Sequence, residues 1–296
     1  MSGMLLRLAG PLAAFGTSAA FHHRDTIAHP TRSALIGMFA ACAGRPRTQA
    51  LDAFTDLPGH PRYHDLGFAL RIDRPGSLYT DFHTVGGGYP RDQQLRTSSG
   101  TRRREDASTL VSYRHYLADP VFTVAVTGPT ALLERIAHHL EHPRYAPYLG
   151  RRNCVPTEPL VLATGVSDPV GELTGGVPLS LARPPRPGVD TVPVDFIWEH
   201  PPPSPAAVEY ELLDVPEDFT QGRRRYQLRS VWRTRQPLPA ALYAGPRPWE
   251  SLSAYMHPEQ PCPPPPPSPA CASTPKARPC AATWPTASNS TKPSCA

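Results

Sequence analysis

Arginines are concentrated in one polar stretch of the sequence, residues 91–104, where five of them accompany a single acid, Asp92. The other residues are mostly Gly, Ser, Thr and Gln, a composition that is flexible in isolation and that phosphate contacts can order. A plain surface loop of this length is unusual in a folded domain. We therefore predict that the stretch contacts a nucleic-acid backbone, with these candidate residues: Arg91, Arg96, Arg102, Arg103 and Arg104, and Arg114 at its base.

A second motif, residues 149–154, places a glycine before two adjacent arginines. A glycine backbone can approach a sugar-phosphate closely, and two guanidinium groups can neutralise it. An ordinary loop with a glycine turn explains the same residues, so the spacing alone does not decide between the two interpretations. We retain Gly150, Arg151, Arg152 and Asn153 as candidate RNA-binding residues.

Imidazoles on either side of the basic stretch indicate a different chemistry. His83 precedes the stretch, and His115 and Tyr116 follow it. Such groups can act as general acid and base in RNA cleavage through the 2′-hydroxyl, a reaction that requires no metal. Hydrogen bonding of the imidazoles at strand ends is the simpler interpretation, and we favour it.

Metal-ligating patterns are weak. His138 and His142 are i, i+4 neighbours, but no third ligand accompanies them. Cys42 lies in an apolar helical pattern, which is typical of a buried free thiol, and the six cysteines include no CxxC pair. We expect no metal, no cofactor and a reducing, cytoplasmic location.

Two periodicities predict the elements that position these residues. Alternating apolar residues indicate strands over 4–8, 68–73, 121–126 and 160–163, the first three separated by helical or polar segments. Helical spacing indicates one helix from Pro30–Thr31 to Gly44 and another that Thr130 caps. The order βαββαβ is that of an α+β ferredoxin-like (RRM-like) fold. In it, the basic stretch becomes an extended arm at about 79–115, between strands two and three.

This arrangement predicts that two helices cover one face of the sheet and leave the other face free. The outward positions of the strands include Arg7, Arg71 and Thr123, and no aromatic residue. Stacking of RNA bases on the open sheet face is therefore disfavoured. We expect loops, the arm and phosphate contacts to bind the nucleic acid instead.

The second half of the sequence predicts fewer elements. Strands are expected over 208–213 and 224–235. The second strand places several arginines on one face: Arg223, Arg225, Arg229, Arg233 and Arg235. We leave open whether this arginine face binds an anionic partner or is a solvated edge of the sheet. We divide the chain into a ferredoxin-like domain (1–165), a smaller β-rich region (166–257) and a disordered, Pro-rich, low-complexity tail (258–296).

Composition excludes two classes of protein. With 296 residues, 40% of them hydrophobic, the chain can bury a core, so it is not disordered throughout. No apolar run approaches the roughly 18 residues of a membrane helix, which excludes an integral membrane protein. The net charge of +5 is mildly basic.

Seven short motifs follow one another through residues 4–257: Leu6–Leu12, Pro30–Gly37, Arg71–Gly76, Asp81–Thr84, Tyr116–Asp119, Leu149–Cys154 and Arg223–Tyr226. Together they resemble the CasD family of CRISPR-associated RAMP proteins, the fifth Cas family, in its type I-E Cascade form. Two features depart from that pattern. Ala13-Ala14-Phe15 replaces a Gln-Ser-Trp-like segment, and the tail matches nothing in the family, as a frameshifted end would.

The resemblance implies a non-catalytic crRNA-binding subunit that grips the 5′ handle of the crRNA and caps one end of the complex. It implies a thumb-like arm next to the backbone subunit, contact with the large subunit, and contact with target DNA only indirectly, through guide-RNA pairing. We add Thr31, Arg32 and Ser33, at the start of the first helix, as candidate ligands of handle phosphates.

Two alternatives remain. The first is a metal-independent endoribonuclease that processes CRISPR repeat RNA with His115 or His83 and Tyr116. The second is a structural protein whose basic patches are incidental.

Overall fold

Seven strands form one antiparallel sheet in the computed structural model, which describes residues 2–20, 22–90, 92–97, 99–103, 109–157 and 159–258. The strands are, in spatial order, β11 (Val208–Asp218), β12 (Arg225–Pro239), β10 (Thr191–Trp198), β5 (Gly67–Arg74), β8 (Val121–Gly128), β1 (Ser2–Ala9) and β9 (Val161–Val166). Leu6 of β1 and Leu70 of β5 both pair with Val124 of the central β8. All of the strands predicted from alternation are present, and β10 is an additional one.

The first face of the sheet packs against α1 (Arg32–Cys42) and α2 (Thr130–Glu141), as predicted. Both helices bury the apolar positions that indicated them, including Ile36 of α1 and Leu133 of α2. Thr31 caps α1 by accepting a hydrogen bond from the Ala34 amide. The predicted cap of α2 is wrong, because Pro129 occupies that position and makes no side-chain cap.

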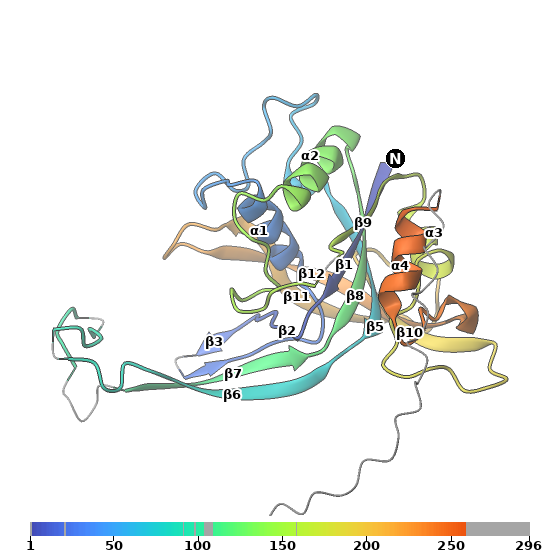
Figure 1. Cartoon of the computed structure of the whole chain (residues 1–296). Helices are drawn as coiled ribbons and strands as arrows, with labels where there is room; N and C mark the ends of the chain where they lie inside the picture. Colours follow the sequence, from blue (N-terminus) through green and yellow to red (C-terminus); the bar gives the residue numbers. More distant parts are fainter. Residues whose placement is uncertain are drawn as a thin grey trace, which may run out of the picture. The chain divides into compact units, whose positions relative to one another are not determined.

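The second face of the sheet is covered, so the prediction of a free face is wrong. α3 (Pro169–Gly175) and α4 (Pro248–Met256) lie on the side opposite α1 and α2 (Figure 1). Their apolar residues, such as Leu173 and Leu252, pack with Leu5 of β1. The sheet is therefore the middle layer of an α/β arrangement that has antiparallel strands and few helices.

Arg71 shows why the sequence misled on this point. Its side chain is fully buried and forms an ion pair with Asp73 at 2.6 Å. Its remaining donors bond the carbonyl oxygens of Leu173, Val177 and Pro178, which connect α3 to the sheet. A charged residue at an alternating position of a strand normally indicates that its side chain is exposed. A buried charge is nevertheless tolerated when all of its hydrogen bonds are satisfied.

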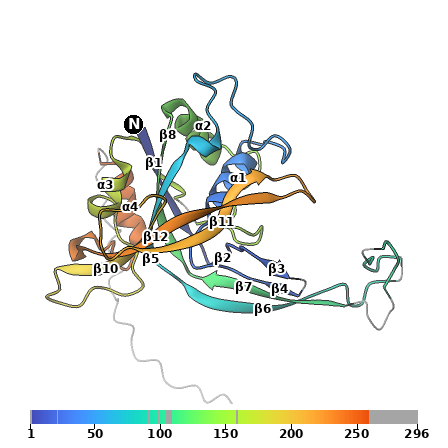
Figure 2. The ribbon, with the colours of Figure 1, turned by 180° about the vertical axis from the view of Figure 1, so that it is seen from behind.

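The basic arm is a two-stranded ribbon. β6 (Ser77–Val85) and β7 (Leu110–Ala118) pair along their whole length and extend away from the seven-stranded sheet (Figure 2). Three two-residue strands join β6 and β7 in a second sheet: β2 (Leu12–Ala13) and β4 (His23–Arg24) pair with β7, and β3 (Ala19–Ala20) pairs with β4. β4 runs parallel to β7 and places Arg24 opposite Arg114.

Most of the arginines of β12 have anionic partners within the chain. Arg229 bonds Asp214 at 2.6 Å and Glu199 at 2.8 Å, while Arg233 and Arg235 both bond Asp195. Burial raises the pKa of Asp195, but hydrogen bonds from these two arginines outweigh it and hold the pKa below its usual value. β12 is an inner strand between β11 and β10, not a solvated edge.

Short elements complete the described chain. They are the 3-10 helices η1 (Tyr63–Asp65) and η3 (Ala240–Leu242). Cys42 and Cys154 are buried free thiols, and burial raises the pKa of Cys42 to about 11. In the part of the chain that the structure describes, no helix is long and apolar enough to cross a bilayer. The predicted tail, apart from Pro258, lies outside the described residues.

Candidate nucleic-acid interface

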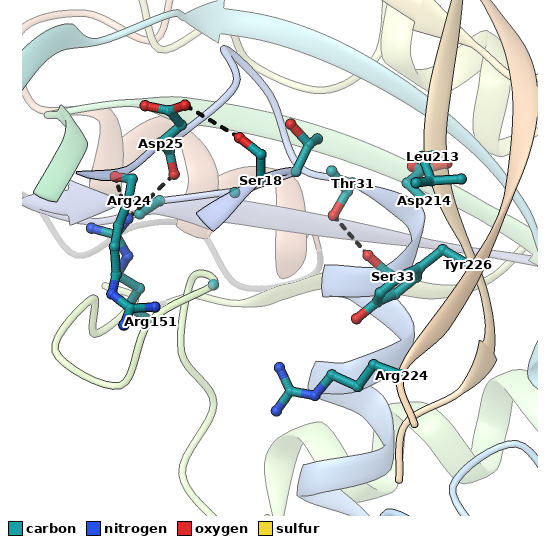
Figure 3. A pocket seen from close by; sticks show the side chains of 14 residues that line it. Ser18, Arg24, Asp25, Thr31, Ser33, Arg151, Leu213, Asp214, Arg224 and Tyr226 are labelled. Atoms are coloured by element: carbon teal, nitrogen blue, oxygen red, sulfur yellow. Dashed lines mark hydrogen bonds between the residues drawn. The ribbon is translucent and has the colours of Figure 1, made fainter. Parts of the chain in front are cut away.

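One cavity of about 400 Å³ collects candidate residues from distant parts of the sequence. Thr31 and Ser33 come from the start of α1, and Gly150 and Arg151 come from the loop after α2. The structure adds residues that the sequence analysis did not propose as site residues: Arg24 of β4, and Arg224 and Tyr226 at the start of β12. In Figure 3, Arg24 and Arg151 lie on one side of this cavity, and Arg224 and Tyr226 lie on the other.

Two acids, Asp25 and Asp214, also line the cavity, but Asp214 pairs with Arg229 and Asp25 lies 3.2 Å from His115. Arg151 donates hydrogen bonds to the carbonyl oxygens of His115 (3.0 Å) and Arg24 (2.9 Å) and lies 4.7 Å from the centre of the Tyr116 ring. These partners are neutral. Among the described residues, no acidic side chain forms an ion pair with Arg24, Arg151 or Arg224. Three guanidinium charges therefore remain for an anionic ligand.

The start of α1 contributes hydroxyl groups but no free cation. Arg32 places its guanidinium against Glu199 at 2.8 Å and the carbonyl oxygens of His64 and Leu66. Its amide donates to the Asp214 carboxylate at 2.7 Å, so a protein carboxylate already occupies this helix N-terminus. These contacts argue against the predicted phosphate contact of Arg32, and we do not carry Arg32 into the interface. Its charge is satisfied by long-range contacts that the motif does not reveal.

Gly150 is required by the fold. Its φ of +85° suits glycine, and a Cβ atom there would lie 1.8 Å from the carbonyl oxygen of Ala14. The Ala14 amide also donates to the carbonyl of Leu149 at 3.0 Å. The close approach inferred from this glycine therefore exists, but its partner is the Ala14 backbone, where we had expected a sugar-phosphate.

Two further cavities adjoin the first at Arg24, which lines all three. The second, of about 540 Å³, is lined by Arg114, Arg151, Arg152 and Asn153 with His83 and Tyr116. The third, of about 430 Å³, lies along the ribbon and is lined by Arg103, Arg114 and His22. We call the three cavities together the basic groove. Most of the described RNA-binding candidates line it.

Two further arm arginines lie beyond the paired part of the ribbon. Arg96 and Arg102 face each other across an isolated bridge, and both are exposed. Next to this bridge, the Thr97 amide donates a hydrogen bond to the Thr101 carbonyl. Arg91 and Arg104 lie outside the described residues.

The proposed acid and base groups are brought together only in part, because His83 and Tyr116 line the same cavity whereas His115 does not. His115 and Tyr116 are neighbours on β7, so their side chains point to opposite faces of the ribbon. His115 lies 3.2 Å from Asp25, whereas the Tyr116 hydroxyl accepts a hydrogen bond from Asn153. His83 lies 3.3 Å from Asp81. Among the described residues, no group of three or more potential metal ligands is present.

Sequence signals existed for only part of this site. The Arg223–Tyr226 segment was one of the seven motifs, and it supplies Arg224 and Tyr226. Arg24 had no signal of its own, because it lies in a polar segment between a histidine pair and an acid. Its importance arises from the pairing of β4 with β7.

Comparisons with known proteins agree with one another. A family model described as CRISPR-associated protein (Cas_Cas5) matches residues 3–232. The chain is 35% identical over 182 residues to the Escherichia coli (strain K12) protein named CRISPR system Cascade subunit CasD, covering 57% of this chain and 74% of that protein.

Two solved structures are also similar. A chain from a CRISPR RNA-guided surveillance complex has a TM-score of 0.75 and 43% identity, over 86% of this chain and 99% of that chain. A crystal structure of a Cas protein has a TM-score of 0.53 and 26% identity, over 81% of this chain and 97% of that chain.

Proposed function

The chain belongs to the Cas_Cas5 family of CRISPR-associated proteins, and on that basis we propose that it is a non-catalytic subunit of a type I-E Cascade complex that binds the 5′ handle of the crRNA. The observation that carries this proposal is the basic groove. Arg24, Arg151 and Arg224 come from three separate elements and line one cavity without acidic partners among the described residues.

The shape of the groove supports a single-stranded ligand. It runs from the start of α1 past Arg24 of β4 and then along β7 of the ribbon, because Arg24 lines all three cavities and Arg114 lines the second and third. A flexible strand can follow such a course and place successive phosphates against guanidinium groups. Thr31, Ser33, Arg151, Arg152, Asn153 and Arg114 are the predicted residues that we propose contact the handle, with Arg24 and Arg224 added.

The fold supports the same proposal. β1, β5, β8 and β9 with α1 and α2 follow the βαββαβ order, and we propose that they form a ferredoxin-like domain. The β6–β7 ribbon lies between strands two and three of this order, and we propose that it acts as the thumb, with Arg96, Arg102 and Arg103 near the guide. We also propose that the chain divides at residues 165 and 257 into the ferredoxin-like domain, the β-rich region and the tail. β10, β11 and β12 of the β-rich region extend the same sheet as the ferredoxin-like domain.

We propose that the partners are the crRNA, the backbone subunit and the large subunit of Cascade. Support comes from the E. coli relative, whose name describes it as a Cascade subunit, and from the similar chain of an RNA-guided surveillance complex. Target DNA is then contacted only through the guide, which reads sequence by base pairing.

A filter-binding titration with handle-bearing RNA tests the groove. Arg24→Ala and Arg224→Ala are each expected to weaken binding by about ten-fold and to lower the slope of log affinity against log salt by about 0.7. Arg186→Ala is the matched control, because this exposed arginine lies between α3 and β10, outside the groove. Unchanged affinity in both groove variants, or an equal loss in the control, contradicts the proposal.

The absence of catalysis has its own test. The divergence of His115 and Tyr116 supports binding without cleavage. Purified protein incubated with repeat RNA in EDTA is expected to leave the RNA intact. Sequence-specific cleavage that His115→Ala or His83→Ala abolishes would establish the endoribonuclease alternative instead.

A further inference from the structure

A separate cavity of about 360 Å³ lies at the second face of the sheet, next to α4. Arg7 of β1, Thr157 before β9, and Arg247, Trp249, Glu250 and Leu252 at the start of α4 line it. None of these residues lines the basic groove. Arg247 and Trp249 also lie beyond residue 232, where the match to the family model ends.

Arg7 carries a buried charge that the described chain does not neutralise. Its side chain is 8% exposed, and its only side-chain hydrogen bond among the described residues is a long one, 3.5 Å, from Nη1 to Thr157 Oγ1. Its Nε is buried, and no residue in the described ranges bonds it. By contrast, Arg71 on the same face bonds a carboxylate and three carbonyl oxygens.

An uncompensated buried guanidinium is costly, so folded proteins normally pair it. Burial lowers the pKa of Arg7, with Arg74 adding to this effect and Asp73 and Asp119 opposing it from a distance. Arg7 lines the cavity. An anion in the cavity would supply the missing partner.

The other lining groups favour one kind of anion. Trp249 is 55% exposed, so its indole offers a large aromatic face. Arg247 supplies a second guanidinium, which pairs with Glu250 at 3.2 Å, and both of these side chains are exposed. Two guanidinium groups beside an exposed indole match a phosphate attached to a flat heterocyclic base.

We propose that this cavity binds a nucleotide, with the phosphate against Arg7 and Arg247 and the base stacked on Trp249. The volume lies within the range of small-ligand sites. A carboxylate of an acidic peptide would satisfy Arg7 but would leave the indole without a specific partner. The nucleotide comes either from solution or from the end of a nucleic-acid strand, and the two sources present the same chemistry.

Calorimetry and tryptophan fluorescence with defined probes test the proposal on the full chain. AMP is expected to bind and to quench Trp249, more tightly than either adenosine or inorganic phosphate by about ten-fold. A 5′-phosphorylated RNA dinucleotide that binds more tightly than AMP indicates a strand end, and equal binding indicates a free nucleotide. Binding of inorganic phosphate as tight as that of AMP, or binding of an acidic peptide alone, overturns the proposal, as does no binding at all.

Substitutions of the lining residues test whether AMP binds in this cavity. Arg7→Leu should weaken AMP binding by about ten-fold, yet raise the melting temperature of the ligand-free protein, because it removes an uncompensated buried charge. Trp249→Leu should abolish the quenching, and Glu250→Gln should tighten binding by removing a nearby negative charge. Arg224→Ala, in the basic groove, should leave AMP binding unchanged, so this site and the handle site are tested independently. Unchanged AMP affinity in both Arg7→Leu and Trp249→Leu refutes the assignment.

Discussion

The guanidinium group of Arg151 donates a hydrogen bond of 2.9 Å to the backbone carbonyl of Arg24. A second bond reaches the carbonyl of Asp25 at 3.2 Å, and a third reaches His115 on the ribbon. One arginine of the basic groove therefore fixes the segment that carries another. Arg151 therefore both positions Arg24 and adds its own charge to the basic groove. Arg24 and Arg152 are exposed.

This relationship predicts unequal effects of two adjacent substitutions. Arg152→Ala should remove one phosphate contact and lower the salt slope of RNA binding by about 0.7. Arg151→Ala should weaken binding further, because residues 22–25 lose one of their attachments to the ribbon and keep the β4–β7 pairing and the contacts of His22 and Asp25. Amide hydrogen exchange should show lost protection of that segment in Arg151→Ala only. Equal affinities and equal exchange in the two variants would show that Arg151 does not position Arg24.

Gly150→Ala is expected to destabilise the fold strongly. The new Cβ would lie 1.8 Å from the Ala14 carbonyl oxygen, and the φ of +85° is unfavourable for alanine. We expect the free energy of unfolding in urea to fall by about 3 kcal/mol or more, as for severe steric conflicts. Gly222→Ala is the matched control, because its φ is +81° and a Cβ there meets nothing within 4 Å. It should cost only about 1–2 kcal/mol.

The Arg71–Asp73 pair should behave as a buried ion pair that is costly to break. Asp73→Asn leaves the fully buried Arg71 guanidinium without its counter-charge. We expect a loss of about 3–5 kcal/mol in the free energy of unfolding. Arg71→Met combined with Asp73→Leu should cost less than Asp73→Asn alone. An exposed pair such as Arg135–Asp56 provides the contrast, and breaking it should cost less than about 1 kcal/mol.

Stability should decrease as pH falls below about 6.5, and His29 should contribute to that decrease. Burial lowers the pKa of its imidazole, which donates from Nδ1 to the Pro30 carbonyl and accepts from the Tyr210 hydroxyl at Nε2. Above pH 6.5 the imidazole is neutral in both states and has no effect. Below it, the unfolded chain binds a proton that the folded chain resists, so stability falls by up to about 1.4 kcal/mol per pH unit.

Urea unfolding at pH 7.5 and pH 5.5 measures this effect. His29→Gln should lose less stability between the two values than the unsubstituted protein, because glutamine does not titrate. An identical loss in both proteins would place the titrating group elsewhere. Asp214, Arg229 and Arg233 also act on this imidazole, so the comparison is best made at fixed ionic strength.

Local patterns were sufficient to predict much of the scaffold. The alternation at residues 68–73 and the helical spacing after Thr31 both correspond to observed elements, because side-chain periodicity reflects which face of an element is buried. The same patterns missed β10 and α3, which lie in a Pro- and Gly-rich segment. They also missed the covering of the second sheet face, because a charged residue such as Arg71 at an alternating position predicts an exposed face, whereas Arg71 is fully buried.

What the sequence by itself determined is the order of the elements, the presence of several arginine-rich segments and the family to which the motifs belong. Only the tertiary structure decided which arginines are available to a ligand. Arg32 and Arg229 are satisfied by Glu199 and Asp214, whereas Arg24 and Arg224 line an open cavity. The physical reason is that a charge is neutralised by whatever lies within a few ångströms of it, and for Arg32 that carboxylate is 167 residues away along the chain.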